Sequence, residues 1–146
     1  MEMSIQRMID ELGTEHRALL GAVRAVEADL EGPAITSTGN LARKLRALAD
    51  ICQEHSEQEE RSEVMTWFMA TFDDLRADME RLNQEHAPML AAVREQAKAC
   101  ESARKVELMS PLAIAIRSAV AALRVHEAAE SALVRRAADR STAKSA

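Results

Sequence analysis

Four apolar heptad patterns, each interrupted by one histidine, constrain the fold of this chain more than any other feature of its sequence. Apolar residues recur at alternating spacings of four and three, the period of helices that pack along one face. The chain has four histidines, and one falls on each pattern. Random placement would give this with odds of roughly 1 in 150, so the patterns favour a shared cause. They are Ile5, Ile9, Leu12, His16, Leu19, Val23, Val26, Leu30; Leu41, Leu45, Leu48, Cys52, His55, Glu59; Leu75, Met79, Leu82, His86, Met89, Val93; and Leu112, Ile116, Ala119, Leu123, His126, Glu130, Leu133.

Few residues break these patterns, and the breaks predict four helices. The helices are expected at about residues 5–30, from about 40 to the upper 60s, from 73 or 74 to about 102, and from 111 to about 138. Ser4 and Ser110 are expected to cap the first and fourth helices, with Pro111 opening the latter. Asp73 or Asp74 is expected to cap the third. The corner before it is predicted at Trp67, Phe68 and Phe72.

Composition supports a helical fold of one domain. Apolar residues make up 47% and charged residues 29% of the 146 residues, whereas aromatic residues, at 2%, are too scarce for a typical sheet. Four helices with single apolar stripes and short connections predict an all-α, antiparallel up-down-up-down four-helix bundle. The bundle is expected to span residues 1–138, followed by a disordered C-terminal tail at 139–146.

The charge and the cysteines restrict partners and location. A net charge of -5 would not attract nucleic acid or an anionic membrane. No apolar run approaches the length of a membrane span, and the N-terminal residues lack the apolar segment of a secretion signal, so a cytoplasmic protein is expected. Cys52 and Cys100 do not form a disulfide framework or a CxxC motif, and are expected to be buried small hydrophobes.

The histidines are expected to share a metal site. At a rise of 1.5 Å per residue, their distances from the helix ends place them level to within about two turns. Two glutamates each follow a histidine by four residues and therefore stack on the same helix face. Six converging ligands predict a site for two metals, because one zinc would leave ligands over, and mixed imidazole and carboxylate sets suit iron or manganese. The predicted ligands are His16, His55, Glu59, His86, His126 and Glu130.

Four other glutamates adjoin a histidine in the sequence. Adjacent helical residues point about 100° apart, so these side chains are expected mainly on the exposed face. Glu127→Ala is therefore expected to change little, whereas Glu130→Ala should lose at least one metal. The four are Glu15, Glu54, Glu85 and Glu127.

The order of these motifs resembles that of the hemerythrin-like HHE cation-binding family. A lone histidine, HSEQE, a second lone histidine in LNQEHAPML, and HEAAE follow one another across nearly the whole chain. Within the family, the ligand pattern is most similar to that of the di-iron repair-of-iron-centres proteins. The resemblance implies two non-haem iron ions joined by an oxo or hydroxo bridge, with manganese or zinc as alternatives. It also implies four terminal histidine ligands and two bridging carboxylates, Glu59 and Glu130.

The sequence departs from the family's oxygen carriers. These have a second histidine where this chain has Leu90, and an aspartate where it has Ser131. Both departures argue against reversible oxygen carriage. The cysteine-bearing N-terminal extension of the repair proteins is also missing from this sequence.

The resemblance therefore implies a protein that binds or senses O2 or NO, or handles iron in oxidative or nitrosative stress. Two octahedral metals with six protein ligands and a bridging oxygen would keep about two exchangeable positions. A catalytic version would reduce NO or peroxide. The alternative is a helical module for structure or protein interaction in which the metal acts only as a staple.

Overall fold

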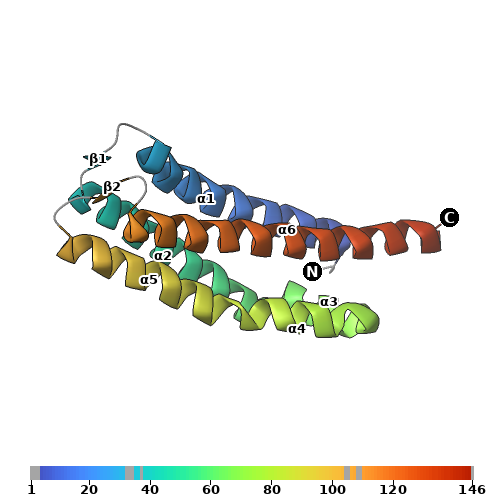
Figure 1. Ribbon diagram of the computed structural model, residues 1–146. Helices are drawn as coiled ribbons and strands as arrows, with labels where there is room; N and C mark the ends of the chain where they lie inside the picture. The colour runs from blue at the N-terminus through green and yellow to red at the C-terminus, as the bar shows by residue number, and fades with distance from the viewer. Residues whose placement is uncertain (1–3, 32–34, 37, 104–105, 108–109, 146) are drawn as a thin grey trace.

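Long helices make up nearly all of the protein that the computed structural model describes, which is residues 4–31, 35–36, 38–103, 106–107 and 110–145. The helix α1 packs against α2 and α6, and α5 packs against the same two helices (Figure 1). The prediction of an all-helical fold is confirmed. In chain order the helices are α1 (Ile5–Glu31), α2 (Thr38–Arg61), α3 (Glu63–Thr71), a 3-10 turn (Asp73–Leu75), α4 (Arg76–Gln84), α5 (His86–Ser102) and α6 (Pro111–Ser145).

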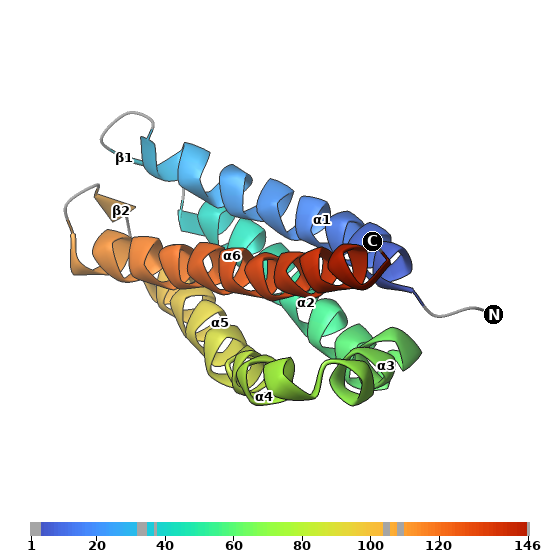
Figure 2. The same cartoon turned by 90° about the vertical axis from the view of Figure 1, so that its right-hand side faces the viewer.

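A two-residue antiparallel pair, which the sequence did not predict, joins two connections at one end of the molecule. The strand β1 (Ile35–Thr36) lies between α1 and α2, and β2 (Val106–Glu107) lies between α5 and α6. Ile35 is opposite Glu107, and Thr36 is opposite Val106. Figure 2 shows the two strands side by side beyond the ends of the helices, so the pair ties the two connections together.

The predicted serine caps of the first and last helices are confirmed. The Ser4 hydroxyl accepts a hydrogen bond from the Arg7 amide at 3.1 Å. Ser110 accepts one from the Ala113 amide at 3.2 Å, and Pro111 opens α6 as expected. These bonds satisfy amides that have no partner within the helix.

The predicted aspartate cap is wrong. Asp73 begins a 3-10 turn, and Leu75 occupies the cap position of α4 without a side-chain hydrogen bond. The second predicted helix is also divided, because Ser62 interrupts it after Arg61 and caps the separate helix α3. The aromatic corner predicted at Trp67, Phe68 and Phe72 does pack together, with ring centroids 5.8 Å apart for Trp67 and Phe72 and 5.2 Å apart for Phe68 and Phe72.

Pro88 explains a second division that the sequence analysis missed. The third predicted helix is split into α4, which ends at Gln84, and α5, which begins at His86. A proline inside a helix lacks the amide that would bond the carbonyl four residues earlier, and its ring clashes with that carbonyl. Four residues before Pro88 is Gln84, so the break lies where this rule puts it. His86 consequently lies in the first turn of α5.

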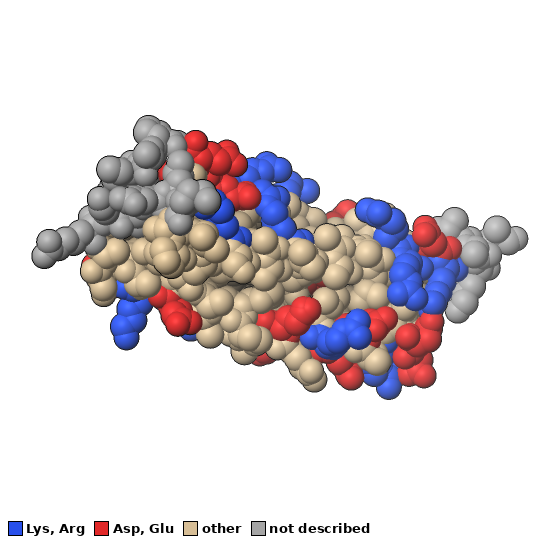
Figure 3. Space-filling model, viewed as in Figure 1, with Lys and Arg blue, Asp and Glu red and all other residues tan. Residues whose placement is uncertain are grey.

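The helix α6 continues beyond its predicted end. Its backbone is helical to Ser145, whereas the sequence predicted an end near Ala138 and a disordered tail. The buried Ala137 and an ion pair between Arg140 and Asp74 hold this part of α6 against α4. Figure 3 shows basic and acidic side chains interspersed at this end of the molecule. The predicted boundary is wrong because these contacts come from another part of the chain.

Two apolar clusters form the core. One includes Leu19, Leu45 and Leu123, and the other includes Leu12, Phe68 and Leu133. Both cysteines are buried, as predicted. Most predicted core positions are correct, but Ile9 is 37% exposed and Met8 takes its place in the core. Among the described residues, no helix is sufficiently long and apolar to cross a membrane.

The cap at Ser62 provides a test of how α3 is held. Ser62→Ala removes the acceptor of the Met65 amide, which lies 3.3 Å from the hydroxyl. The free energy of unfolding is expected to fall by about 1 kcal/mol. Urea denaturation measures the change, with Ser118→Ala as the control at an exposed position within α6. Equal effects of the two substitutions would contradict the assignment of Ser62 as a cap.

Candidate metal centre

Seven ionisable side chains are buried together between the two apolar clusters. All six predicted ligands belong to this polar layer, and Glu127 is the seventh member. Each is at most 7% exposed, and Glu130 is completely buried. The members are His16, His55, Glu59, His86, His126, Glu127 and Glu130.

The heptad positions bring the four histidines to one level. Along the chain, each histidine lies between residues of one apolar cluster and residues of the other; His16, for example, lies between Leu12 and Leu19. The ring centroids of His16 and His55 are 5.8 Å apart, those of His55 and His86 are 5.5 Å apart, and those of His86 and His126 are 4.8 Å apart. The predicted common level of the histidines is therefore confirmed.

Glu59 lies between two histidines from different helices. Its Oε1 atom is 3.0 Å from His55 Nε2, and its Oε2 atom is 3.1 Å from His86 Nε2. Each carboxylate oxygen therefore faces a different imidazole, so Glu59 connects α2 with the first turn of α5 within the layer.

Glu130 has a similar disposition and adjoins the Glu59 carboxyl group. Its Oε2 atom is 3.1 Å from His126 Nε2 and 3.8 Å from His55 Nε2. Its Oε1 atom is 3.8 Å from His16 Nε2. This carboxylate therefore reaches histidines on three helices.

Glu127 is a site residue that the sequence analysis placed on the exposed face, and that expectation is wrong. It is 3% exposed, with Oε2 2.6 Å from His16 Nε2 and Oε1 3.7 Å from His55 Nε2. A second heptad pattern on α6 could have revealed it. All its members are buried: Ile116, Val120, Leu123, Glu127, Glu130, Val134 and Ala137. This pattern contains both carboxylates, whereas the one used for prediction contains only Glu130.

The outer nitrogens of three histidines contact side chains at the edge of the layer. His55 Nδ1 donates a hydrogen bond to Glu15 at 2.9 Å. The Ser131 hydroxyl is 3.2 Å from His16 Nδ1, and a Glu85 oxygen is 3.6 Å from His126 Nδ1. The hydrogen-bonding partners Glu15 and Ser131 orient their imidazoles so that Nε2 points inward, whereas the Glu85 contact is too long for a hydrogen bond.

Burial disfavours the charged form of every group in the layer, and neighbouring charges then decide each pKa. Burial opposes protonation of His16, but the close carboxylates of Glu127 and Glu130 outweigh it and raise the pKa to about 9. Burial, together with a close carboxyl group, raises the pKa of Glu59 to about 9. Burial and the charges of neighbouring histidines lower the pKa of His86 to about 4. Without metal, protons therefore hold this layer together.

Many polar atoms of the layer remain without a hydrogen bond of good geometry. They include Nε2 of His16 and His55 and both carboxylate oxygens of Glu59, Glu127 and Glu130. Buried polar atoms in native proteins nearly always have a partner, and an unsatisfied carboxylate is especially unfavourable. A bound cation would satisfy these inward-facing atoms together.

The spacing of the ligand atoms also fits a metal. Two ligands at right angles, each about 2.1 Å from an ion, are about 3.0 Å apart. The Nε2 atoms of His86 and His126 are 3.0 Å apart. Two overlapping groups have their ligand atoms within 4.8 Å of one another, and each could hold a metal ion. The groups are His55, His86, His126, Glu130 and His16, His55, Glu127, Glu130.

Comparisons with models of known protein families, with curated proteins and with solved structures find no match to this chain.

The raised pKa values of His16 and Glu59 predict opposite pH dependences for folding and for metal binding. Both values are about 9 in the folded chain, above references of 6.5 for His16 and 4.5 for Glu59. Each group therefore contributes its full stabilisation of the folded chain when the pH is below its reference pKa. This contribution to the unfolding free energy is lost as the pH rises through the folded pKa of about 9. Metal ligands must be deprotonated, so apparent affinity should rise over the same interval.

Urea unfolding and Co2+ titration, each at about pH 7 and about pH 9, measure the two dependences. The metal-free protein should be less stable at the higher pH and should bind Co2+ more tightly there. Higher stability of the metal-free protein at the higher pH would contradict the assignment of these protons.

Proposed function

We propose that this chain is a hemerythrin-like, non-haem di-iron protein that binds or senses O2 or NO, or handles iron under oxidative or nitrosative stress. The observation that carries the proposal is the buried layer of four imidazoles and three carboxylates whose inward atoms lack good hydrogen bonds. The proposal includes an antiparallel up-down-up-down arrangement of α1, α2, α5 and α6. The reversal of direction between successive long helices in Figures 1 and 2 supports this topology.

In this proposal the ligands divide between two ion positions, and His55 belongs to both of the groups that could hold a metal. His86 and His126 serve one position, and His16 and His55 serve the other. Glu59 and Glu130 each have oxygens directed toward histidines of both pairs, so they are the bridging carboxylates in this proposal. Glu127 contacts only the second pair, which makes the two positions unequal.

This seventh ligand changes the number of exchangeable positions. Two octahedral ions offer about twelve positions, of which the four histidines fill about four and the bridging carboxylates about four. A bridging oxygen ligand fills about two and Glu127 about one, so about one remains open instead of the two counted from six ligands. The open position belongs to the ion held by His86 and His126.

A small cavity beside the proposed centre supports the proposal of a diatomic ligand. It has a volume of about 10 Å³, and its polar lining residues include His55, His86, His126 and Glu127. The remaining lining is mainly apolar and includes Leu19, Cys52, Met89 and Leu123. A space of this size holds about one water-sized molecule, and the apolar wall disfavours bulk water. When bound, iron would supply reversible one-electron chemistry and affinity for O2 or NO, while these side chains limit what reaches it.

Metal content and the visible spectrum test the proposal directly. Protein prepared without chelator should contain about two irons per chain and a visible absorption that changes on reduction and on addition of NO. A colourless protein that holds zinc and responds to neither treatment would favour the structural staple. Failure of the anaerobic protein to take up ferrous ion would refute a metal function.

The role of Glu127 predicts a specific change in NO stoichiometry. The reduced wild-type centre is expected to bind about one NO, and Glu127→Ala about two, because removal of this carboxylate opens a position without removing a bridge. Glu54→Ala is the matched control, since Glu54 also adjoins a ligand histidine but is exposed. Optical titration with NO, with iron measured on the same samples, gives the ratio. If Glu127→Ala binds no more NO than Glu54→Ala, then Glu127 is not a ligand.

A further inference from the structure

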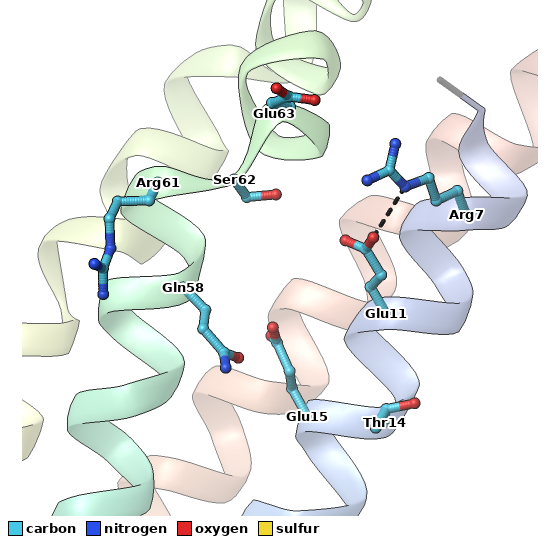
Figure 4. A pocket seen from close by; sticks show the side chains of 8 residues that line it. All are labelled: Arg7, Glu11, Thr14, Glu15, Gln58, Arg61, Ser62 and Glu63. Atoms are coloured by element: carbon cyan, nitrogen blue, oxygen red, sulfur yellow. Dashed lines mark hydrogen bonds and ion pairs between the residues drawn. The ribbon is translucent and has the colours of Figure 1, made fainter. Parts of the chain in front are cut away.

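A hollow on the surface, between α1 and the α2–α3 junction, adjoins the polar layer. Its volume is about 590 Å³, and its wall combines side chains from both sides of the gap. Figure 4 shows Glu15 projecting from α1 toward Gln58 of α2 at its inner end. The acidic and uncharged residues that line it are Glu11, Thr14, Glu15, Gln58, Ser62 and Glu63.

A smaller cavity continues inward from this hollow. It has a volume of about 20 Å³ and shares Glu11, Glu15 and Ser62 with the outer space. Its lining also includes Glu59, whose side chain is only 4% exposed and whose two oxygens lack a hydrogen bond of good geometry. The two spaces therefore adjoin one another, and the inner one reaches a carboxylate of the proposed centre.

Glu15 lies where the outer and inner spaces meet. Its side chain is 22% exposed, and its Oε2 atom accepts the hydrogen bond from His55 Nδ1 at 2.9 Å. Glu15, His55 and Glu59 also have ligand atoms within 4.8 Å of one another. A cation held by Glu15 would therefore lie close to two residues of the proposed centre, His55 and Glu59.

The two arginines at the hollow are engaged with other side chains. Arg7 pairs with Glu11 at 3.0 Å, and Arg61 pairs with Glu57 at 3.4 Å. In Figure 4 the Arg61 guanidinium lies on the side of α2 away from Glu15. Neither of these ion pairs involves Glu15, whose carboxylate lines the inner cavity together with those of Glu11 and Glu59.

We propose that the two spaces form a route that admits divalent cations to the centre and that Glu15 is the transfer ligand between solvent and the pair of Glu59 and His55. The inference rests on the proposed metal function. A carboxylate suits a hydrated divalent cation because its oxygens replace water ligands one at a time. The cation keeps its oxidation state along the route, and the protons it displaces leave from His55 and Glu59.

Glu85 is the control for the loss of a negative charge beside a ligand histidine. Glu15 and Glu85 each approach the Nδ1 atom of such a histidine, at 2.9 Å from His55 and 3.6 Å from His126 respectively. Only Glu15 also lines the two spaces described above. If the loss of this charge were the whole effect, replacing either glutamate would change metal uptake similarly.

Stopped-flow mixing of the full, metal-free chain with Co2+, followed by its visible absorption, tests the route. Glu15→Gln is expected to slow uptake about tenfold or more while the final amount bound stays at the wild-type level. Glu85→Gln should change the rate less than about twofold. Uptake at the wild-type rate in Glu15→Gln, equal slowing by both variants, or a lower final amount in Glu15→Gln would each overturn the transfer role.

A second variant tests the route without changing a residue near the centre. Thr14→Lys adds a positive charge at the exposed wall of the hollow and should slow uptake about threefold at low salt and less at high salt. Ser118→Lys makes the same charge change at an exposed position outside that wall and is the control. Equal rates for the two lysine variants would overturn the route. If the wild-type chain bound no metal at all, the proposed function itself would fail.

Discussion

The burial of a complete ionisable layer between two apolar clusters is the constraint on which the rest of the structure depends. Such a layer is unfavourable unless its charges are paired or coordinate metal. The four long helices must therefore pack so that their imidazoles lie at one level and contact one another. This requirement fixes the relative register of the helices more strictly than apolar packing alone. In the metal-free chain, shared protons provide part of this pairing. A bound cation would replace several protons at once, so metal loading and the stability of the helix packing are expected to be linked.

Much of this arrangement could be predicted from sequence, because helical periodicity and capping are local properties. Spacing alone predicts the apolar heptad patterns and the common level of the histidines. Residue type and position predict the serine caps at Ser4 and Ser110. The break before His86 could also have been predicted, since Pro88 removes a bond to Gln84. The second heptad register of α6 indicates the burial of Glu127, but two registers fit this helix, and the choice between them depends on contacts with other parts of the chain. The extension of α6 depends in the same way on contacts with α4.

The proposed centre is unequal in both electrostatics and access. Glu127 adds negative charge beside His16 and His55, whereas the small apolar-walled cavity adjoins His86 and His126 as well. The hollow that contains Glu15 approaches from another direction, between α1 and α2. A small neutral ligand and a hydrated cation thus have separate approaches in this proposal, each lined by side chains suited to its own chemistry.

The order of the ligands along the chain has a consequence for biosynthesis. His16 lies in the first helix, whereas His126, Glu127 and Glu130 lie in the last. A nascent chain therefore offers only three histidines and Glu59 until α6 has left the ribosome. The full ligand set forms only when the two ends of the chain meet. A metal ion in the proposed centre would therefore be bound by the full ligand set only after α6 has packed against the other helices.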